Sequence, residues 1–315
     1  MMLARRKNMV LLLGWGILGV LLASPVRATE LKPQTVAAFD EYVGAAEARM
    51  GDDLREDHFL VVDSLPDPTR QEIYAHLWLG QVYIQPLRTL KDGRPIHVPD
   101  GLIHHWVGVI FVPGATISNV MDVLGDYDHQ RDIYKPDVRK SRLLDQNGNE
   151  SDFFEQFYNK SIISVVLNAN FEAYYTPLHP ARAEIRSYST RIAEVQDPGK
   201  SDERELPVGN DHGYLWRIYS YWRIEEKDGG VYVQVESLGL SRTIPAIFAL
   251  LVRPLLRSIP EGYLTRLLDN TRKAVEDSSS RNLADPGLQR ASRTAEPGEP
   301  LRRSYSGSDT NSSPH

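Results

Sequence analysis

A succession of long strand-like segments with short connections, followed by one long apolar segment, constrains the fold of this chain most strongly. Two of the connections, 146–149 and 228–230, carry the Asn/Asp/Gly signals of hairpin turns. Strands joined by such short turns pair antiparallel, because parallel neighbours need a long crossover. The sequence therefore predicts one large antiparallel sheet. Its strand-like segments are 101–112, 137–145, 151–159, 162–176, 182–196, 213–226 and 230–242.

The segment after the last strand predicts helical structure. Residues 244–256 are apolar on nearly every side, and a helix of this kind must be buried or face a membrane. Residues 258–261 match a capping box, which predicts a new helical start there. We therefore predict an α+β fold of the helix-grip type, a curved antiparallel sheet of about seven strands wrapped around a long C-terminal helix. The apolar stripe of that helix is Leu264, Leu267, Leu268, Thr271 and Val275.

This order of elements and two segments resemble the START-like domains of the SRPBCC superfamily, which includes polyketide cyclases and birch-pollen-allergen-like proteins. Residues 101–134 (GLIHHWVGVIFVPGATISNVMDVLGDYDHQRDIY) resemble the opening of such a domain. Residues 235–272 (VESLGLSRTIPAIFALLVRPLLRSIPEGYLTRLLDNTR) resemble its last strand and gripping helix. The resemblance covers about residues 100–276. It implies a cavity between sheet and helix that binds lipids, sterols, polyketides or other apolar molecules.

Outside this domain the sequence predicts three further regions. Residues 1–28 have the pattern of a secretory signal peptide, with a basic start, an apolar core and cleavage after Ala28. The alternative is an uncleaved membrane anchor. Residues 29–99 form a helical or irregular extension whose first helix spans 34–51, and its role stays open. Residues 277–315 are rich in Ser, Arg, Pro and Gly, which predicts a disordered tail.

Composition and missing motifs exclude several classes of function. The chain has no cysteine, which excludes disulfides and thiolate chemistry, and its net charge of −6 argues against nucleic-acid binding. No nucleotide-binding loop, Gly-x-Ser-x-Gly or His-Glu-x-x-His motif occurs. Asp126, Asp128, His129 and Asp132 could hold a hard cation, but a solvated helix end is the preferred interpretation. We expect no catalytic residue, no metal and no cofactor.

Strand alternation suggests which side chains face the cavity. In 213–226, the set containing Trp216, Ser220 and Trp222 is the better inner face, whereas neither face of 182–196 is cleanly apolar. We hypothesise that Arg186 or Arg191 contacts the polar head of an apolar ligand. The alternative is an internal ion pair or a solvated strand end. The candidate ligand contacts are Trp106, Phe171, Tyr175, Arg186, Tyr188, Trp216, Ser220, Trp222, Phe248, Leu251 and Leu255.

The leading functional prediction is an exported protein, periplasmic or secreted, that binds a lipid or other hydrophobic small molecule and carries it. Segment 244–256 could serve as a lid or contact a membrane transiently, against the alternative of plain burial. Two other functions stay open. One is a cyclase or dehydratase acting in the same cavity, where Tyr175, Arg186, Tyr188 or Ser220 would assist. The other is a non-catalytic envelope interaction protein with a filled core.

Overall fold

The computed structural model describes residues 29–160, 164–243 and 246–284, and for residues 246–257 and 281–284 it describes the backbone only. The predicted signal peptide and residues 285–315 of the predicted tail lie outside the described residues. The helices are α2 (Pro33–Arg55), the 3-10 helix η1 (Val61–Ser64), α3 (Asp67–Trp78), α4 (Ile117–Leu124), α5 (Gln130–Ile133) and α6 (Ala246–Ala284).

A nine-stranded antiparallel sheet forms the centre of the molecule, in the order β2-β5-β13-β12-β9-β8-β7-β6, with β10 paired to β9. Its strands are β2 (Tyr83–Pro86), β5 (Gly101–Pro113), β6 (Val138–Asn147), β7 (Glu150–Lys160), β8 (Ser164–His179), β9 (Arg182–Gln196), β10 (Arg204–Glu205), β12 (Arg217–Lys227) and β13 (Gly230–Arg242). Short pairs outside it join β1 (Thr29–Glu30) to β11 (Asn210–Asp211) and β3 (Leu90–Lys91) to β4 (Arg94–Pro95). All seven predicted strands are present.

The hairpin between β12 and β13 shows how local sequence sets the register. Lys227 pairs with Gly230, so the turn consists of Asp228 and Gly229 alone. Both turn residues have positive φ, 57° and 75°, as a two-residue type I′ turn requires. This register places alternate residues of the two strands on the same face of the sheet.

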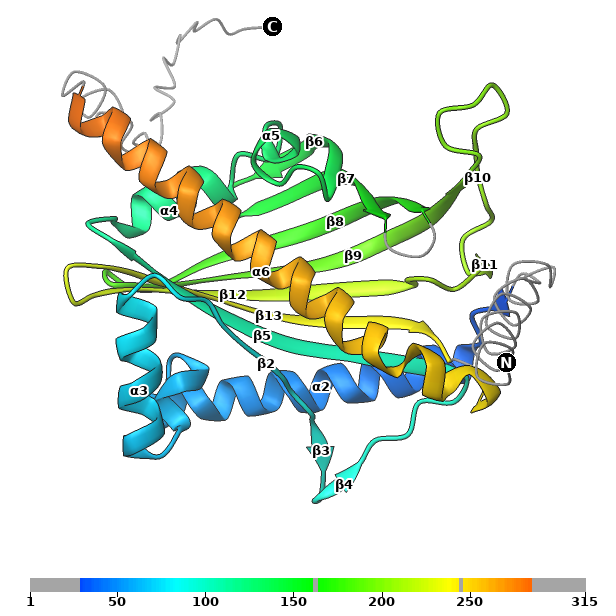
Figure 1. The fold of residues 1–315 in the computed structure, drawn as a ribbon, viewed down its shortest axis with the longest axis horizontal. Coiled ribbons are helices and arrows are strands. Elements are labelled where there is room, and N and C mark those ends of the chain that lie inside the picture. The colour runs from blue at the N-terminus through cyan, green and yellow to red at the C-terminus, as the bar shows by residue number, and fades with distance from the viewer. Residues whose placement is uncertain (1–28, 161–163, 244–245, 285–315) are drawn as a thin grey trace, which may run out of the picture.

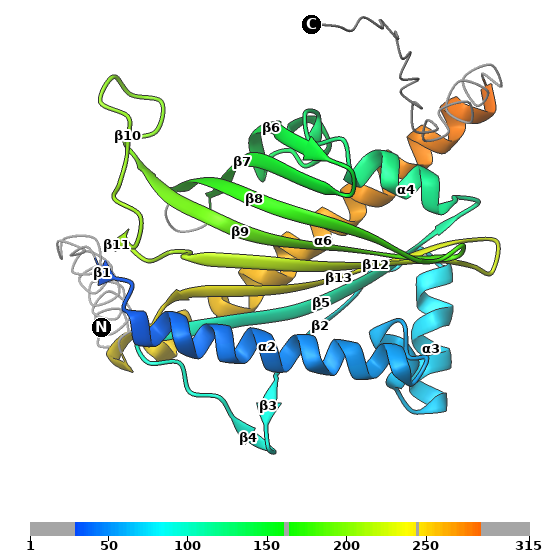
Figure 2. The same ribbon diagram turned by 180° about the vertical axis from the view of Figure 1, so that it is seen from behind.

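Helix α6 crosses one face of the sheet and α2 crosses the other (Figures 1 and 2). On the α6 face, Leu264, Leu268 and Val275 are buried against the main core, and Thr271 between them is fully buried. The helix approaches β5 at Gly108, where an added methyl group would lie 2.5 Å from Leu268 Cδ1. The sheet and α6 therefore form the predicted helix-grip arrangement.

Two details of α6 differ from the sequence prediction. It is one continuous helix through Pro254 and Pro260, whereas the capping-box pattern at 258–261 predicted a new start. It also continues to Ala284, beyond the boundary predicted at residue 276. A proline removes one backbone hydrogen bond of a helix, and the buried stripe from Leu264 to Val275 holds the part of α6 that follows Pro260 against the sheet.

Helix α2 buries its apolar side, including Phe39, Val43 and Met50, against the second face of the sheet. Polar contacts complete this layer. Glu47 Oε1 accepts hydrogen bonds from the hydroxyls of Tyr188 and Tyr221, both at 2.8 Å. Residues 33–55 are thus built into the fold as a cover for half of the sheet.

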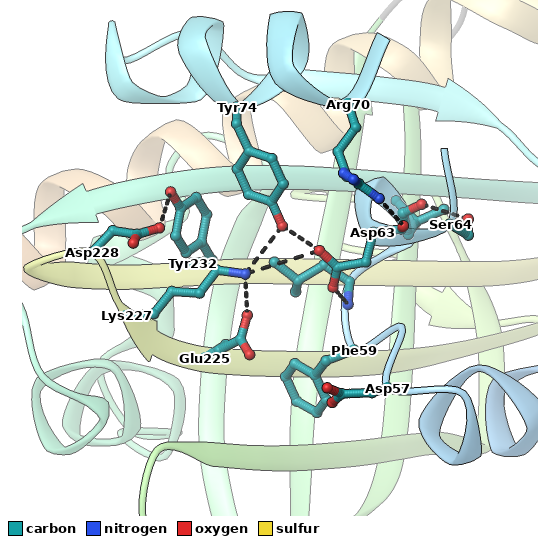
Figure 3. A network of polar contacts seen from close by, with 12 residues as sticks. Asp57, Phe59, Asp63, Ser64, Arg70, Tyr74, Glu225, Lys227, Asp228 and Tyr232 are labelled. Carbon is teal, nitrogen blue, oxygen red and sulfur yellow. Dashed lines mark hydrogen bonds and ion pairs between the residues drawn. The ribbon is translucent and has the colours of Figure 1, made fainter. Parts of the chain in front are cut away.

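Helix α3 lies across the end of the sheet at the β12–β13 turn (Figure 1). Lys227 points into a group of side chains from both elements (Figure 3). Its Nζ lies 2.7 Å from Glu225 Oε2 and 3.2 Å from Tyr74 Oη, and Tyr74 in turn donates to Asp63. Beside them, Tyr232 donates to Asp228 Oδ2 at 3.1 Å. This network fastens α3 and η1 to the sheet.

Candidate functional site

A cavity of about 90 Å³ lies between the sheet and α6. Side chains from α4, α5, six strands of the sheet and α6 enclose it, so the cavity is in the place that the helix-grip arrangement predicts. Most of its wall is apolar. The apolar lining residues are Leu124, Val138, Phe153, Phe157, Phe171, Ala173, Ile185, Ile218, Trp222, Val235, Leu264 and Leu267.

Stacked aromatic rings form one wall of the cavity. The ring centroids of Tyr127 and Phe153 are 4.3 Å apart at an interplanar angle of 17°, and those of Phe153 and Phe171 are 4.9 Å apart at 11°. Phe157 meets Phe171 edge-on at 6.0 Å. Such rings provide a large, rigid apolar surface.

Glu155 is the one carboxyl group among the described lining residues. It is only 7% exposed, and its side chain has no hydrogen-bond or ion-pair partner among the residues that the structure describes. Burial raises the pKa of Glu155 to about 8, because a charged carboxylate would be poorly solvated there. The carboxyl is therefore protonated in most molecules at neutral pH.

Uncharged polar side chains share the cavity with Glu155. They are Gln130 and three tyrosines, Tyr127, Tyr134 and Tyr263. Gln130 Nε2 donates to Leu124 O at 3.0 Å, and the hydroxyls of Tyr134 and Thr271 lie 3.1 Å apart. Burial raises the pKa of Tyr127 to about 12 and raises the pKa values of the other two tyrosines as well. All three hydroxyls thus stay neutral at physiological pH.

A row of three serines crosses the sheet at another part of the lining. Ser220 of β12 pairs with Ser187 of β9 on one side and with Ser237 of β13 on the other. All three line the cavity, and their hydroxyls have no hydrogen-bond partner among the described residues. They are free to bind polar atoms of a ligand or water.

The structure places the candidate ligand contacts in different parts of the fold. Phe171, Ser220 and Trp222 line the cavity. Trp106 is buried in the same core and Tyr175 packs against it, but neither lines the cavity. The side chains of Phe248, Leu251 and Leu255 lie outside the described residues, so their contacts with a ligand stay predictions.

Three other candidates lie on the opposite face of the sheet, which corrects the prediction. Arg186 and Tyr188 point toward α2, where Arg186 donates to Glu184 Oε2 at 3.3 Å and Tyr188 donates to Glu47. Trp216 precedes the first residue of β12, where strand alternation no longer applies, and packs in the α2 core. The inward side chains of β9 are the smaller set, including Ile185 and Ser187.

The hypothesis of an arginine contacting the ligand's polar head also fails for the second residue named for it. Arg191 pairs with Glu205 of β10 at the surface, with both side chains partly exposed. A bulge at Thr190 shifts the register of β9, since Ser189 and Arg191 face successive residues of β8. No Lys, Arg or His occurs among the described residues that line the cavity.

Glu155, Tyr127, Tyr134 and Tyr263 were not predicted as site residues. A signal for Glu155 was present in the sequence, because it lies two residues from Phe153 and from Phe157 on one strand and so shares their face. A carboxyl between two inward-facing aromatic residues is an unusual pattern. Tyr127 and Tyr134 flank α5 and Tyr263 lies on α6, and only the fold brings these two segments together.

The acidic segment after α4 uses its charges locally. Asp126 Oδ1 lies 2.7 Å from His129 Nδ1, Asp128 accepts from the backbone of Leu143, and Asp132 pairs with Lys135. Throughout the described part of the chain, no group of three or more acidic or histidine side chains is arranged to hold a metal ion. None of the helices among residues 29–160, 164–243 and 246–284 is both long enough and apolar enough to cross a membrane.

A second, more open hollow of about 470 Å³ lies between α3 and the β12–β13 turn, around the network of Figure 3. Its charged side chains already contact one another: Arg182 pairs with Asp57 and Glu225, and Lys227 with Glu225. These contacts join β9 and β12 to each other and to Asp57 after α2, so the charges are already paired within the protein. The candidate site is therefore the cavity under α6.

No family model matches the sequence, and no curated protein matches it. Solved structures do match. A STAR-related lipid transfer protein from Xanthomonas axonopodis is 16% identical, with a TM-score of 0.41 over 61% of this chain and 98% of that one. Human STARD10 is 10% identical, with a TM-score of 0.42 over 72% of this chain and 86% of that one.

The Zhui aromatase/cyclase from a Streptomyces species is 16% identical, with a TM-score of 0.38 over 59% of this chain and 99% of that one. At these identities and scores the similarity concerns the fold, and no function follows from it. The strand order and the position of α6 show by themselves the α+β helix-grip fold that the sequence predicts. The chain therefore has the helix-grip fold that its sequence resemblance to START-like domains implies.

Proposed function

We propose that this protein binds a hydrophobic small molecule of the lipid class in the cavity between the sheet and α6. The observation that carries the proposal is the cavity lining, which combines stacked aromatic rings with polar groups that have no partner among the described residues. Small-molecule sites typically combine a mostly apolar wall with a small number of polar groups. A filled structural core would leave no such groups unsatisfied.

The size of the cavity bears on how a ligand enters. Its volume of about 90 Å³ is smaller than the roughly 300–1,000 Å³ of typical ligand pockets. We propose that α6 moves away from the sheet when the ligand binds. A protein that opens and closes in this way could carry its ligand through water.

Native mass spectrometry of residues 29–315, purified from the native host, tests this function. We expect a bound apolar molecule at about one per chain. Ser220→Leu, which fills part of the cavity, should lose the ligand. Thr190→Leu, the same kind of change at an exposed position of β9, should keep it. A chain that stays without ligand after incubation with host lipid extract would contradict the proposal and favour an envelope interaction protein.

The proposal includes export, with residues 1–28 as a cleaved signal peptide. N-terminal sequencing of the protein from culture fractions should find Thr29 as the first residue, in a periplasmic or secreted fraction. Recovery of the uncleaved chain in membranes would support the anchored alternative.

Transient membrane contact is a further part of the proposal. Trp78 and Leu79, at the end of α3, are 61% and 75% exposed and give this corner of the molecule an apolar surface. Vesicle flotation with Trp78→Ser/Leu79→Ser tests the contact. Unchanged flotation of this variant would rule out this corner as the contact.

Catalysis in the same cavity is the second candidate, and Glu155 is the observation that favours it. A carboxyl whose pKa is raised to about 8 can act as a general acid near neutral pH. Turnover that Glu155→Gln abolishes while ligand affinity persists would establish an enzyme.

A further inference from the structure

Glu155 distinguishes this cavity, because it is buried and no described side chain carries a counter-charge to it. It lies on β7, opposite Ser141 of β6 and Ala169 of β8, neither of which can neutralise it. The described titratable groups that face the cavity around it are Tyr127, Tyr134 and Tyr263. The nearby pair of Asp137 and Arg266 is joined by two hydrogen bonds of 2.7 Å and is satisfied within itself.

A buried carboxyl in this setting differs from one that builds the fold. It has no partner among the described residues, although the lost hydrogen bonds of a buried polar group destabilise a protein by about 1–3 kcal/mol. The Glu155 carboxyl faces the cavity although it destabilises the fold, and it is therefore available to a ligand. In its protonated form it donates one hydrogen bond to an acceptor atom.

The charge of the lining restricts what that acceptor can belong to. Among the described lining residues there is no cationic side chain, so a carboxylate or phosphate head would be buried without a counter-ion. Beside an ionised Glu155 it would also be repelled. A neutral carbonyl, ester or ether oxygen needs no counter-ion and is not repelled by Glu155.

We infer that the cavity takes an uncharged amphiphile, whose polar end accepts a hydrogen bond from the protonated carboxyl of Glu155, and that it excludes anionic lipids. This inference rests on the proposed function, that the cavity binds an apolar ligand. It adds the chemical class of the ligand and the residue that selects it.

Three probes with the same chain length separate the ligand classes. Octan-2-one accepts hydrogen bonds only, octanoate is an anion, and octylamine is a cation between pH 6.5 and pH 9.5. Calorimetric titration of the mature protein at these two pH values measures each affinity. Glu155→Gln is the matched variant, because its amide has nearly the same shape and donates at both pH values.

We expect octan-2-one to bind wild type best at pH 6.5 and about tenfold more weakly at pH 9.5, where Glu155 has lost its proton. The Tyr127 hydroxyl stays protonated there, since its pKa is about 12. In Glu155→Gln the affinity for the ketone should be equal at the two pH values. Octanoate should bind at least tenfold more weakly than the ketone.

Other outcomes would overturn the inference in distinguishable ways. Ketone binding that does not depend on pH in wild type would show that Glu155 is not the donor. Octylamine binding that strengthens at pH 9.5 and exceeds that of the ketone would make the cavity a cation site. Equal or tighter binding of octanoate would refute the exclusion of anions. If none of the three binds, the proposed function itself fails.

A second measurement covers the case in which Glu155→Gln does not fold. Carbon-detected NMR titration of the wild-type carboxyl, with and without octan-2-one, reads the proton directly. A bound acceptor stabilises the protonated form and should raise the pKa of Glu155 further. An unchanged pKa in the presence of bound ketone would refute the contact.

Discussion

The two faces of the sheet use buried polar groups in opposite ways. On the α2 face, Glu236 lies 2.7 Å from His105 Nε2 and pairs with Arg49, while Tyr42 contacts the other nitrogen of His105 at 2.9 Å. Burial raises the pKa of Glu236, but the hydrogen bond from His105 and the charge of Arg49 outweigh it, and the net pKa is lowered. On the α6 face, burial alone acts on Glu155, and its pKa is raised.

The difference teaches how to separate structural from functional polar groups when both are buried. The carboxylates under α2 are saturated by side chains of the protein itself, so they attach a helix and leave nothing for a ligand. The carboxyl and the serine row under α6 have no such partners among the described residues. Two carboxyl groups that are equally buried can therefore have different roles. A carboxyl with protein partners is structural, and one without them is available to a ligand.

The largest effect should come from breaking an ion pair on the α2 face. Arg223 donates to Glu184 Oε1 at 3.0 Å and to the backbone oxygens of Phe59 and Met50. Arg223→Ala removes the buried partner of Glu184 and leaves it only the half-exposed Arg186 at 3.3 Å, and it also removes the hydrogen bonds to the two backbone oxygens. It should lower the free energy of unfolding by about 3–5 kcal/mol. Urea denaturation measures it. Arg191→Ala, which breaks an exposed pair, is the control and should cost about 1 kcal/mol or less.

Glu155 should make the free energy of unfolding fall as the pH rises, whereas a paired carboxylate makes it rise. Its pKa is about 8 in the folded chain against an ordinary value near 4.5. Between these values the folded state holds a proton that the unfolded state has lost. The stabilising effect is therefore complete below pH 4.5 and decreases by up to about 1.4 kcal/mol per pH unit as the pH rises toward 8.

Glu155→Gln should remove this contribution. Urea denaturation of wild type and variant at pH 5, 6.5 and 8 should show wild type losing several kcal/mol relative to the variant as pH rises. Parallel curves would mean that the carboxyl has a partner in solution.

The contact between α6 and the sheet should be sensitive to one methyl group. In Gly108→Ala the new Cβ would lie 2.5 Å from Leu268 Cδ1, which should displace α6 and cost about 1–3 kcal/mol. Hydrogen exchange of residues 262–275 should accelerate in this variant. Gly239→Ala is the control, since a Cβ there meets no atom closer than 3.5 Å. Equal exchange in both variants would refute a tight contact.

Substitutions at two neighbouring residues of β12 should have the smallest effects on stability, and they compare the two faces of the sheet directly. Tyr221→Phe removes a 2.8 Å hydrogen bond to Glu47 on the α2 face and should cost about 1.5 kcal/mol, because Tyr188 still donates to Glu47. Ser220→Ala removes a hydroxyl on the α6 face that has no partner in the described part of the chain, and it should change stability by less than about 0.5 kcal/mol. Thermal unfolding measures both. A costly Ser220→Ala would contradict the contrast between the faces.

Local patterns in the sequence predict the sheet well, because strand alternation and turn signals act over short distances. The structure reproduces the predicted bounds of β9 and β13, 182–196 and 230–242. The start of α4 is also set locally, because the Thr116 hydroxyl accepts from the backbone N–H of Asn119 as a helix cap. The apolar stripe of α6 lies against the sheet as its spacing predicts.

The site was harder to predict because it depends on what covers each face. The polar set of β9, with Arg186 and Tyr188, suggested a ligand contact only while its partner was unknown. Helix α2 supplies Glu47 as the partner of Tyr188 from far away in the chain, whereas Arg186 pairs with Glu184 of its own strand. No local pattern shows that α2 covers this face. The bulge at Thr190 adds to the difficulty, since it brings Ile185 and Ile192 to the same core despite their odd spacing.

The strand order has a consequence for how the chain assembles. β5 pairs with β13, so the apolar run from Val107 to Val112 has its main partner only after more than a hundred further residues have been made. Pairing over such a separation slows folding. Meanwhile the exposed run is prone to aggregation. We expect a chaperone that holds unfolded chains to bind here first, and the last long strand to complete the fold by releasing it.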